Sequence, residues 1–219
     1  MSVDLFHGMD AASGVCWAVA YLLIIRRGFL DRACGVPLLA LAAAINWELI
    51  YAVVQPTPDL PAIVVPTWLA IDAVIVYLYL RYSEDGQSRA RFAAVMAAAF
   101  AVEYSFILDF GDHDGVYSGF AVNVVMSVAF IAILERRRDV RGQSMYIALA
   151  KMAGTLVTIP HAYALHGSMW SLRVLMVITV VCDVVYAVLL GRRLRALGMR
   201  PWATWAHRLS RARRAAKRA

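Results

Sequence analysis

Seven apolar segments, each close to the length that crosses a lipid bilayer, dominate this chain. They span residues 11–26, 35–54, 61–81, 92–108, 116–134, 144–163 and 169–190. A transmembrane helix needs about 20 mostly apolar residues, and these segments are too long and too uniformly apolar for the strands of a membrane barrel. Little sequence remains for a soluble domain. The pattern predicts an all-α integral membrane protein, a seven-transmembrane-helix bundle whose membrane domain covers residues 1–191.

The basic residues predict the orientation of this bundle. All but two of the 22 Lys and Arg residues follow the first, third, fifth and seventh segments. Loops rich in Lys and Arg stay on the cytoplasmic side of a membrane, which places the N-terminus outside and the C-terminus in the cytoplasm. The formal charge of +7 is therefore a sign of membrane sidedness, and no nucleic-acid partner is needed to explain it. We expect a multi-pass protein of a bacterial-type inner or plasma membrane.

The basic C-terminal tail, residues 192–219, is a separate segment. It combines many arginines with Trp202 and Trp205, which is typical of a segment held at the membrane interface by aromatic anchors and anionic lipid. A nucleic-acid arm or a partner site is the alternative for this tail.

A faint internal repeat is visible in the chain. The stretch "AVAYLLIIRR" at 18–27 is similar to "SVAFIAILER" at 127–136, and Asp72 and Asp183 are separated by a similar interval. Such matches predict a 3+1+3 arrangement in which the fourth segment links two related halves, as in some transporters. Chance similarity between apolar sequences is the alternative explanation.

Four acids fall inside the predicted spans: Glu48, Asp72, Glu103 and Asp183. Insertion scales put the cost of an Asp at a helix centre at about 2.5–3.5 kcal/mol, so four such residues require a reason. Their depths allow all four to point into one central cavity, and hydrogen-bonded acids that join helices are the alternative. Lys151 also lies within a span, where it either extends toward the interface or pairs with Asp183 or Asp72.

Glu48 and Asp183 are the predicted catalytic pair. A carboxyl group in a dry pocket keeps its proton, because burial disfavours the anion. Such a group can protonate a weakly basic substrate if a second carboxylate stabilises the cation that forms. Helical spacing places Tyr51 on the face of Glu48, where its hydroxyl can hold the carboxyl group, and Tyr186 on the face of Asp183. We expect Glu48 to be protonated and Asp183 ionised, although the two roles are exchangeable.

Aromatic side chains are the predicted walls of the cavity. Their faces stabilise cations by about 0.5–2 kcal/mol each, whereas ordinary helix packing or a belt at the membrane interface is the alternative. The predicted substrate-binding residues are six aromatic residues and the polar residue next to one of them: Trp47, Tyr51, Trp68, Tyr77, Tyr104, Tyr186 and Asn46. The stretch "DFGDHDG" at 109–115 is interpreted as a polar turn in preference to a metal site, and we expect neither a metal nor a cofactor.

The stretches "NWELIYAVV" (46–54) and "CDVVYAVLL" (182–190) resemble one family of enzymes. These are the small integral-membrane terpene cyclases of fungal meroterpenoid pathways and of bacterial drimentine-type indole-sesquiterpenoid pathways. The resemblance implies a seven-helix protein in which Glu48 and Asp183 are essential acids. It also implies lipophilic prenylated substrates, on which the enzyme protonates a terminal alkene or epoxide of a farnesyl-type chain.

By this resemblance the cation then cyclises without a metal ion, an isomerase or lyase type of reaction. The DDxxD and DxDD motifs of soluble terpene cyclases do not occur in the sequence, in agreement with scattered carboxyl groups as the acids. A small seven-helix transporter that uses carboxylates near the middle of the membrane is the second hypothesis.

Overall fold

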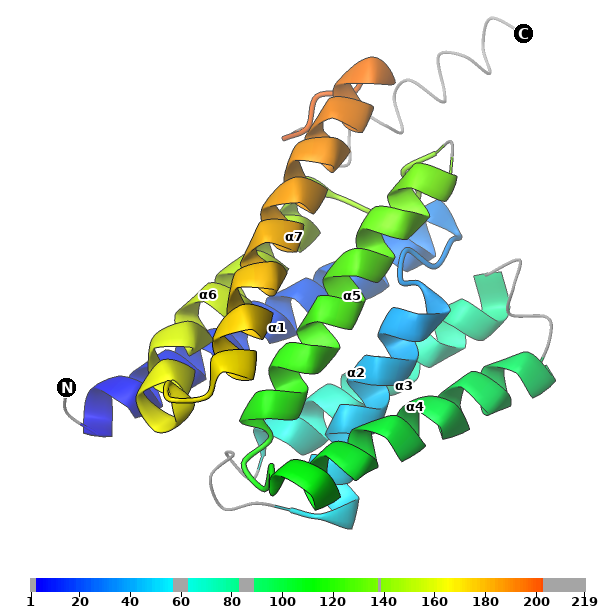
Figure 1. Ribbon diagram of the computed structural model, residues 1–219. Coiled ribbons are helices and arrows are strands. Elements are labelled where there is room, and N and C mark those ends of the chain that lie inside the picture. Colours follow the sequence, from blue (N-terminus) through cyan, green and yellow to red (C-terminus); the bar gives the residue numbers. More distant parts are fainter. Residues whose placement is uncertain (1–2, 57–62, 83–88, 138, 203–219) are drawn as a thin grey trace, which may run out of the picture.

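The computed structural model describes residues 3–56, 63–82, 89–137 and 139–202, and within these ranges the chain forms helices and no strand (Figure 1). The helices are α1 (Val3–Asp31), α2 (Leu38–Leu49) with its π-helical continuation η1 (Ile50–Val54), α3 (Val64–Tyr82), α4 (Arg89–Phe110), α5 (Val116–Arg136), α6 (Met145–His166) and α7 (Trp170–Ala196). The predicted all-α bundle of seven helices is confirmed. Most of the predicted tail lies outside the described residues.

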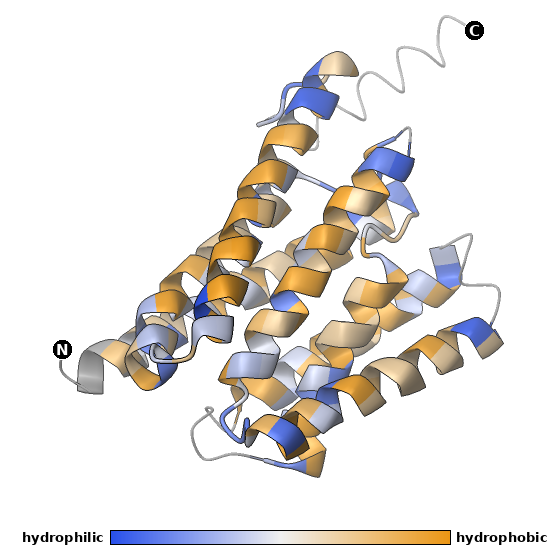
Figure 2. Ribbon diagram, viewed as in Figure 1, coloured by the Kyte–Doolittle hydropathy of each residue, from blue (hydrophilic) through white to orange (hydrophobic). Residues whose placement is uncertain are grey.

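Five helices are long and apolar enough to cross a membrane: α3, α4, α5, α7 and residues Gly8–Asp31 of α1. The helical stretch Leu38–Val54 is shorter, and α6 carries several polar residues along its 22 residues. Figure 2 shows apolar residues along most of the length of these helices and hydrophilic residues gathered near their ends. The predicted sidedness remains a prediction, as does the bacterial membrane.

The first helix begins earlier than its predicted span of 11–26. Two polar residues in this extension or near it, Asp10 and Ser13, form side-chain hydrogen bonds to α6. Hydropathy left Asp10 outside the predicted span, whereas in the structure its carboxyl group is hydrogen-bonded to His161 of α6. One side of α1 at Asp10 and Ser13 therefore faces α6.

The pairs of helices that pack together follow a symmetric pattern. Helices α1 and α2 both pack on α3, and correspondingly α5 and α6 both pack on α7. Between the two groups, α1 packs on α6 and α2 packs on α5. Helix α4 packs mainly on α2, at the edge of the bundle (Figure 1). A repeat that relates helices α1–α3 to helices α5–α7 predicts these pairs, with α4 as the linker.

Two loops that such a repeat makes equivalent meet at one end of the bundle. The α1–α2 loop and the α5–α6 loop touch at Gly35 and Gly142, where a Cβ on Gly35 would overlap the carbonyl oxygen of Gly142. The Gly142 N–H donates to Oδ2 of Asp31 at 2.8 Å, and Nη1 of Arg137 donates to the carbonyl oxygen of Cys34 at 2.8 Å. These contacts close this end of the molecule.

Replacing Gly142 by alanine should destabilise the bundle. Gly142 has a φ of +76°, and a Cβ there would lie 2.5 Å from the backbone nitrogen of Gly35. A left-handed backbone in a non-glycine residue costs about 1–3 kcal/mol, and the contact adds strain. Thermal unfolding in detergent should show a lower midpoint for Gly142→Ala. Gly191→Ala, whose Cβ would meet only the sulfur of Met145 at 3.8 Å, should not lower it. Equal midpoints for Gly142→Ala and the native chain would contradict the loop contact.

Candidate active site

One cavity of about 480 Å³ lies between helices α1, α2, α3, α5 and α6, within the range of roughly 300–1,000 Å³ typical of small-molecule sites. Trp17, Trp47, Trp68 and Phe120 form much of its apolar wall. The side chains that give the cavity its polar character are Asp10, Ser13, Tyr21, Glu48, Asp114, Asn123, Thr155, Thr158, His161 and His166. A second hollow, on the outer side of α1 and α3, has only apolar residues and Thr67 along its surface and offers no acid or base.

Glu48 is the most deeply buried of the acids that line this cavity. Its side chain is buried, and the hydroxyl of Tyr21 donates to Oε1 at 3.0 Å. Within the described part of the chain, Oε2 has no hydrogen-bond partner. Asp72 of α3 is buried near Glu48 and Tyr21. The site thus has one carboxyl oxygen held in place and the other without a partner among the described residues.

The indole of Trp47, next to Glu48, is fixed by the start of α5. Its Nε1 donates to the carbonyl oxygen of Gly115 at 3.2 Å and to Oγ of Ser118 at 3.1 Å. Gly115 is tightly packed, because a Cβ there would lie 3.0 Å from the Trp47 ring. The orientation of this wall is therefore set by a backbone position that only glycine accommodates easily.

Tyr51 braces this wall and does not hold Glu48 as the sequence led us to expect. Its hydroxyl donates to the carbonyl oxygen of Asp112 at 2.5 Å, and its ring packs 5.0 Å from that of Trp47. The carboxylate of Asp112 accepts the backbone N–H groups of Tyr117 and Ser118 at 2.9 and 2.7 Å. Residues 111–115 thus form a polar turn that caps α5, as interpreted from the sequence, whereas Asp109 and Phe110 are the last residues of α4.

Asp183 lies outside the cavity lining, in a polar cluster of its own. Its Oδ1 accepts from Nζ of Lys151 at 2.7 Å and from Oγ of Ser127 at 2.6 Å. The Lys151 and Asp183 side chains are only 5% and 3% exposed. The Lys151 ammonium also lies 5.7 Å from the centre of the Trp17 ring. Of the two interpretations of Lys151, pairing with Asp183 is the one that the structure shows.

Each group of three helices therefore contributes one residue per helix to a buried polar cluster. Tyr21 of α1, Glu48 of α2 and Asp72 of α3 form the first, which reaches the cavity through Tyr21 and Glu48. Ser127 of α5, Lys151 of α6 and Asp183 of α7 form the second. The second cluster contains a cation and an anion, whereas the first contains two acids and a phenol.

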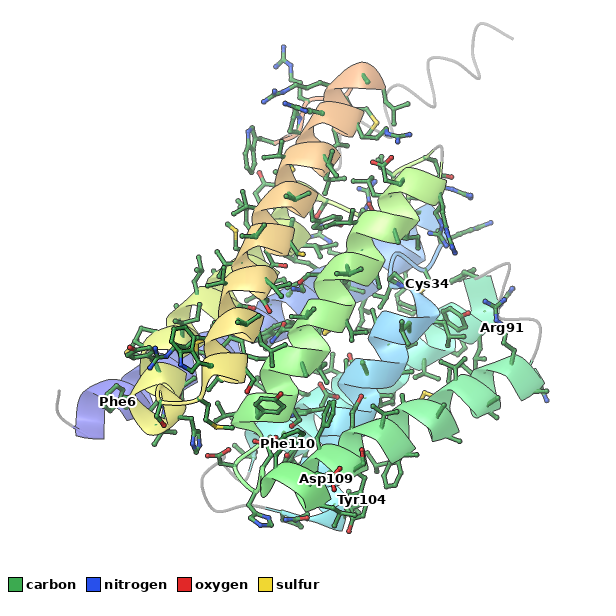
Figure 3. The ribbon with its side chains drawn as sticks, viewed as in Figure 1. Phe6, Cys34, Arg91, Tyr104, Asp109 and Phe110 are labelled. Carbon is green, nitrogen blue, oxygen red and sulfur yellow. The ribbon has the colours of Figure 1, made fainter. Side chains whose placement is uncertain are left out.

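The structure does not bring the remaining predicted residues to the cavity. Their places are as follows: Asn46 donates to the carbonyl oxygen of Met96, Tyr77 is 53% exposed and packs on Phe29, Tyr104 stacks on Phe100 of α4, Tyr186 packs on Phe130, and Glu103 is buried on α4. Figure 3 shows Tyr104 on α4, on the opposite side of the bundle from Phe6 at the start of α1. Of the predicted aromatic walls, Trp47 and Trp68 line the cavity.

Several lining residues were not predicted. Tyr21 and Trp17 lie four residues apart on α1, a spacing that places both on one face of a helix, and this spacing was the available signal. Asn123 is a polar residue within an apolar span, and its side-chain oxygen is buried without a hydrogen-bond partner among the described residues. No sequence pattern indicated that His161 and His166 of α6 line a cavity, because their aspartate partners, Asp10 and Asp114, come from distant parts of the chain.

The site thus places a buried acid at an aromatic-walled cavity within a helical bundle. The comparison with known families is specific. The family model of the Pyr4-like transmembrane terpene cyclases matches residues 2–194. Because this match covers most of the chain, the protein belongs to that family, and it is a multi-pass membrane protein.

Curated relatives of this chain are fungal terpene cyclases. It is 25% identical over 160 residues to the Pyr4-family terpene cyclase mfmH of Annulohypoxylon moriforme, an alignment that covers 68% of this chain and 66% of the relative. It is 29% identical over 157 residues to terpene cyclase olcD of Penicillium canescens, covering 66% and 62%. The chain thus aligns with somewhat less than two thirds of the length of these proteins. No solved structure matches the chain.

Proposed function

We propose that this protein is a terpene cyclase that protonates the far end of a prenyl chain and lets the resulting carbocation cyclise within the cavity. The substrate is a lipophilic small molecule that carries a farnesyl-type chain, and its reactive end is an alkene or an epoxide. The family match supports the class of reaction. The arrangement of Glu48 supports the way in which it begins.

One observation carries this proposal. Glu48 is 1% exposed, lines the cavity, and has one carboxyl oxygen held by Tyr21 and the other without a partner among the described residues. Transfer of a proton from this carboxyl group to the less substituted carbon of the terminal alkene leaves a tertiary cation on the chain. Internal double bonds then attack that cation in turn, and loss of a proton or capture of water ends the sequence. Glu48 regains a proton before the next cycle.

The walls of the cavity suit such a reaction. The rings of Trp17, Trp47 and Trp68 line it, and aromatic faces stabilise a cation without forming a bond to it. They also exclude water, which would otherwise capture the cation early. Asn123 adds an amide oxygen among these rings.

We assign Asp183 an indirect part. The sequence suggested a direct role for it, either in tuning the proton of Glu48 or in stabilising the cation. Its carboxylate instead pairs with Lys151, whose ammonium faces the ring of Trp17, and Trp17 lines the cavity. Asp183 is thus a positioning residue that acts on the cavity through Lys151 and Trp17.

The reaction and its first step can be tested together in heavy water. Purified protein in detergent is given a farnesylated aromatic substrate in D₂O, and the product is analysed by mass spectrometry. A cyclised alkene substrate should retain one carbon-bound deuterium. An epoxide substrate should gain a hydroxyl group whose label washes out in ordinary water.

The same experiment separates the enzyme from the transporter hypothesis. A carrier moves its cargo unchanged and needs a sealed vesicle, whereas a cyclase needs neither a gradient nor a sealed compartment. If the substrate is recovered unchanged in detergent, and uptake is seen only into sealed vesicles, the proposed function is wrong.

A further inference from the structure

The end of the cavity opposite Glu48 carries two Asp–His pairs. Nδ1 of His161 lies 2.9 Å from Oδ1 of Asp10, and Nε2 of His166 is hydrogen-bonded to Oδ2 of Asp114. All four residues line the cavity. The ring of His161 is held further by stacking on Phe6, 4.7 Å between centroids, at the end of α1 seen in Figure 3. Neither pair has a part in the proposed protonation.

The Asp10–His161 pair lies far from the acid. Asp10 and Tyr21 are eleven residues apart on α1, which corresponds to roughly 16 Å along a helix axis, and Tyr21 contacts Glu48. Protonation begins at the tip of the prenyl chain, so the tip must reach Glu48. Whatever the other end of the chain is attached to must then lie near the Asp–His pairs.

The surface between these two ends changes from polar to aromatic. One turn inward from Asp10, the hydroxyl of Ser13 lies 2.7 Å from that of Thr158. One further turn along α1 lies Trp17, followed by Tyr21. A molecule with one polar end and one apolar end fits this order in a single direction.

We propose that the two Asp–His pairs form a binding site for the polar head of the substrate, and that this head is an uncharged ring bearing O–H or N–H groups. This assignment rests on the proposed function for the direction in which the chain lies. A carboxylate accepts the N–H of a histidine, so the second nitrogen of a neutral ring is an acceptor. His161 and His166 each offer such a nitrogen to a donor on the head.

Charge selects against an anionic head. Among the described residues that line the cavity there is no Lys or Arg, whereas Asp10 and Asp114 both lie at this end. A diphosphate would therefore meet two carboxylates without a permanent cation to balance its charge. The site favours the neutral product of a prenyl-transfer reaction over the prenyl diphosphate itself.

Binding can be measured without turnover in the Glu48→Gln background. The cavity tryptophans report binding through quenching of their fluorescence in detergent. The probes are farnesylhydroquinone, its dimethyl ether, which lacks only the O–H donors, and farnesyl diphosphate. The protein should bind the hydroquinone about tenfold more tightly than the ether, because two net hydrogen bonds are lost in the ether. The diphosphate should bind more weakly than either.

The variants His161→Phe and His166→Phe, called the rim variants below, each replace one histidine of the two pairs. They should remove the preference for the hydroquinone over its ether and leave the affinity for the ether unchanged. His113→Phe is the matched control, since His113 is an exposed histidine in the same end of the molecule and does not line the cavity. It should keep the full preference.

Three outcomes would overturn the proposed head site: no preference for the hydroquinone in the Glu48→Gln protein, an equal loss of both neutral probes in the rim variants, or tight binding of the diphosphate. An equal loss would mean that the pairs only join α1 and the α5 turn to α6. Because these measurements involve no cyclisation, they stand or fail separately from the proposed reaction.

Discussion

Replacing Glu48 by glutamine should abolish cyclisation while leaving a folded protein. Glutamine has nearly the same shape and can still accept the hydrogen bond from Tyr21, but its amide cannot supply a proton to an alkene. General acid catalysis contributes about 10²–10⁴ to a rate, and here no other described acid lines the deep end of the cavity. Product formation by the purified variant should therefore fall by about three orders of magnitude or more.

Glu103→Gln is the matched control for this variant. Glu103 is also buried, at 6% exposure, but it lies on α4 and does not line the cavity. The same chemical change there should leave most of the activity. Comparable activity in Glu48→Gln and the native protein would remove Glu48 as the proton donor, and a selective loss in Glu103→Gln would point to an acid that the cavity does not reveal.

Breaking the Lys151–Asp183 pair should have the second largest effect, mainly on folding. In Asp183→Asn the Lys151 ammonium keeps its charge and loses its counter-ion inside the bundle. Removing one partner of a buried ion pair costs about 3–5 kcal/mol. We expect a much lower unfolding midpoint, a low yield of folded protein, and little cyclisation.

The double variant Lys151→Met, Asp183→Asn distinguishes a positioning role from a chemical one. Both charges are removed, the volumes are nearly kept, and the introduced amide can still bond with Ser127, so folding should return. If Asp183 serves only to balance the buried charge of Lys151 and so to hold the helices and the cavity wall in place, cyclisation should return with folding in large part. A double variant that folds as well as the native protein and remains inactive would show that the Asp183 carboxylate takes part in the reaction.

The sequence predicts the number and the order of the helices well, because the length and apolarity of each segment are local properties. Each predicted span lies largely within one helix of the structure. The sequence also singles out Glu48, because an acid inside an apolar span is costly whichever direction its face of the helix points. A charged residue such as Lys151 is costly in an apolar span for the same reason. The sequence left two interpretations of it open, extension toward the interface or pairing with an acid such as Asp183.

The rotation of each helix about its axis is a different matter, because it depends on the neighbours that pack against it. Tyr51 does share a face with Glu48 in sequence, yet its hydroxyl is drawn to Asp112, in the turn before α5. Tyr21, from another helix, contacts the carboxyl group instead. For Asp183 the partners Ser127 and Lys151 likewise come from two other helices. These contacts fix the site, and no single segment encodes them.

The two polar clusters divide the molecule into parts with different tolerance for change. In the α5–α7 part, a cation and an anion cancel each other and join three helices, so this part acts as a fixed frame. In the α1–α3 part, Glu48 and Asp72 are held without a neutralising cation among their described partners. Substitutions meant to change the reaction are therefore best confined to α1–α3 and the lining of the cavity. The Ser127–Lys151–Asp183 cluster should be left unchanged, because it holds the three helices that support the cavity.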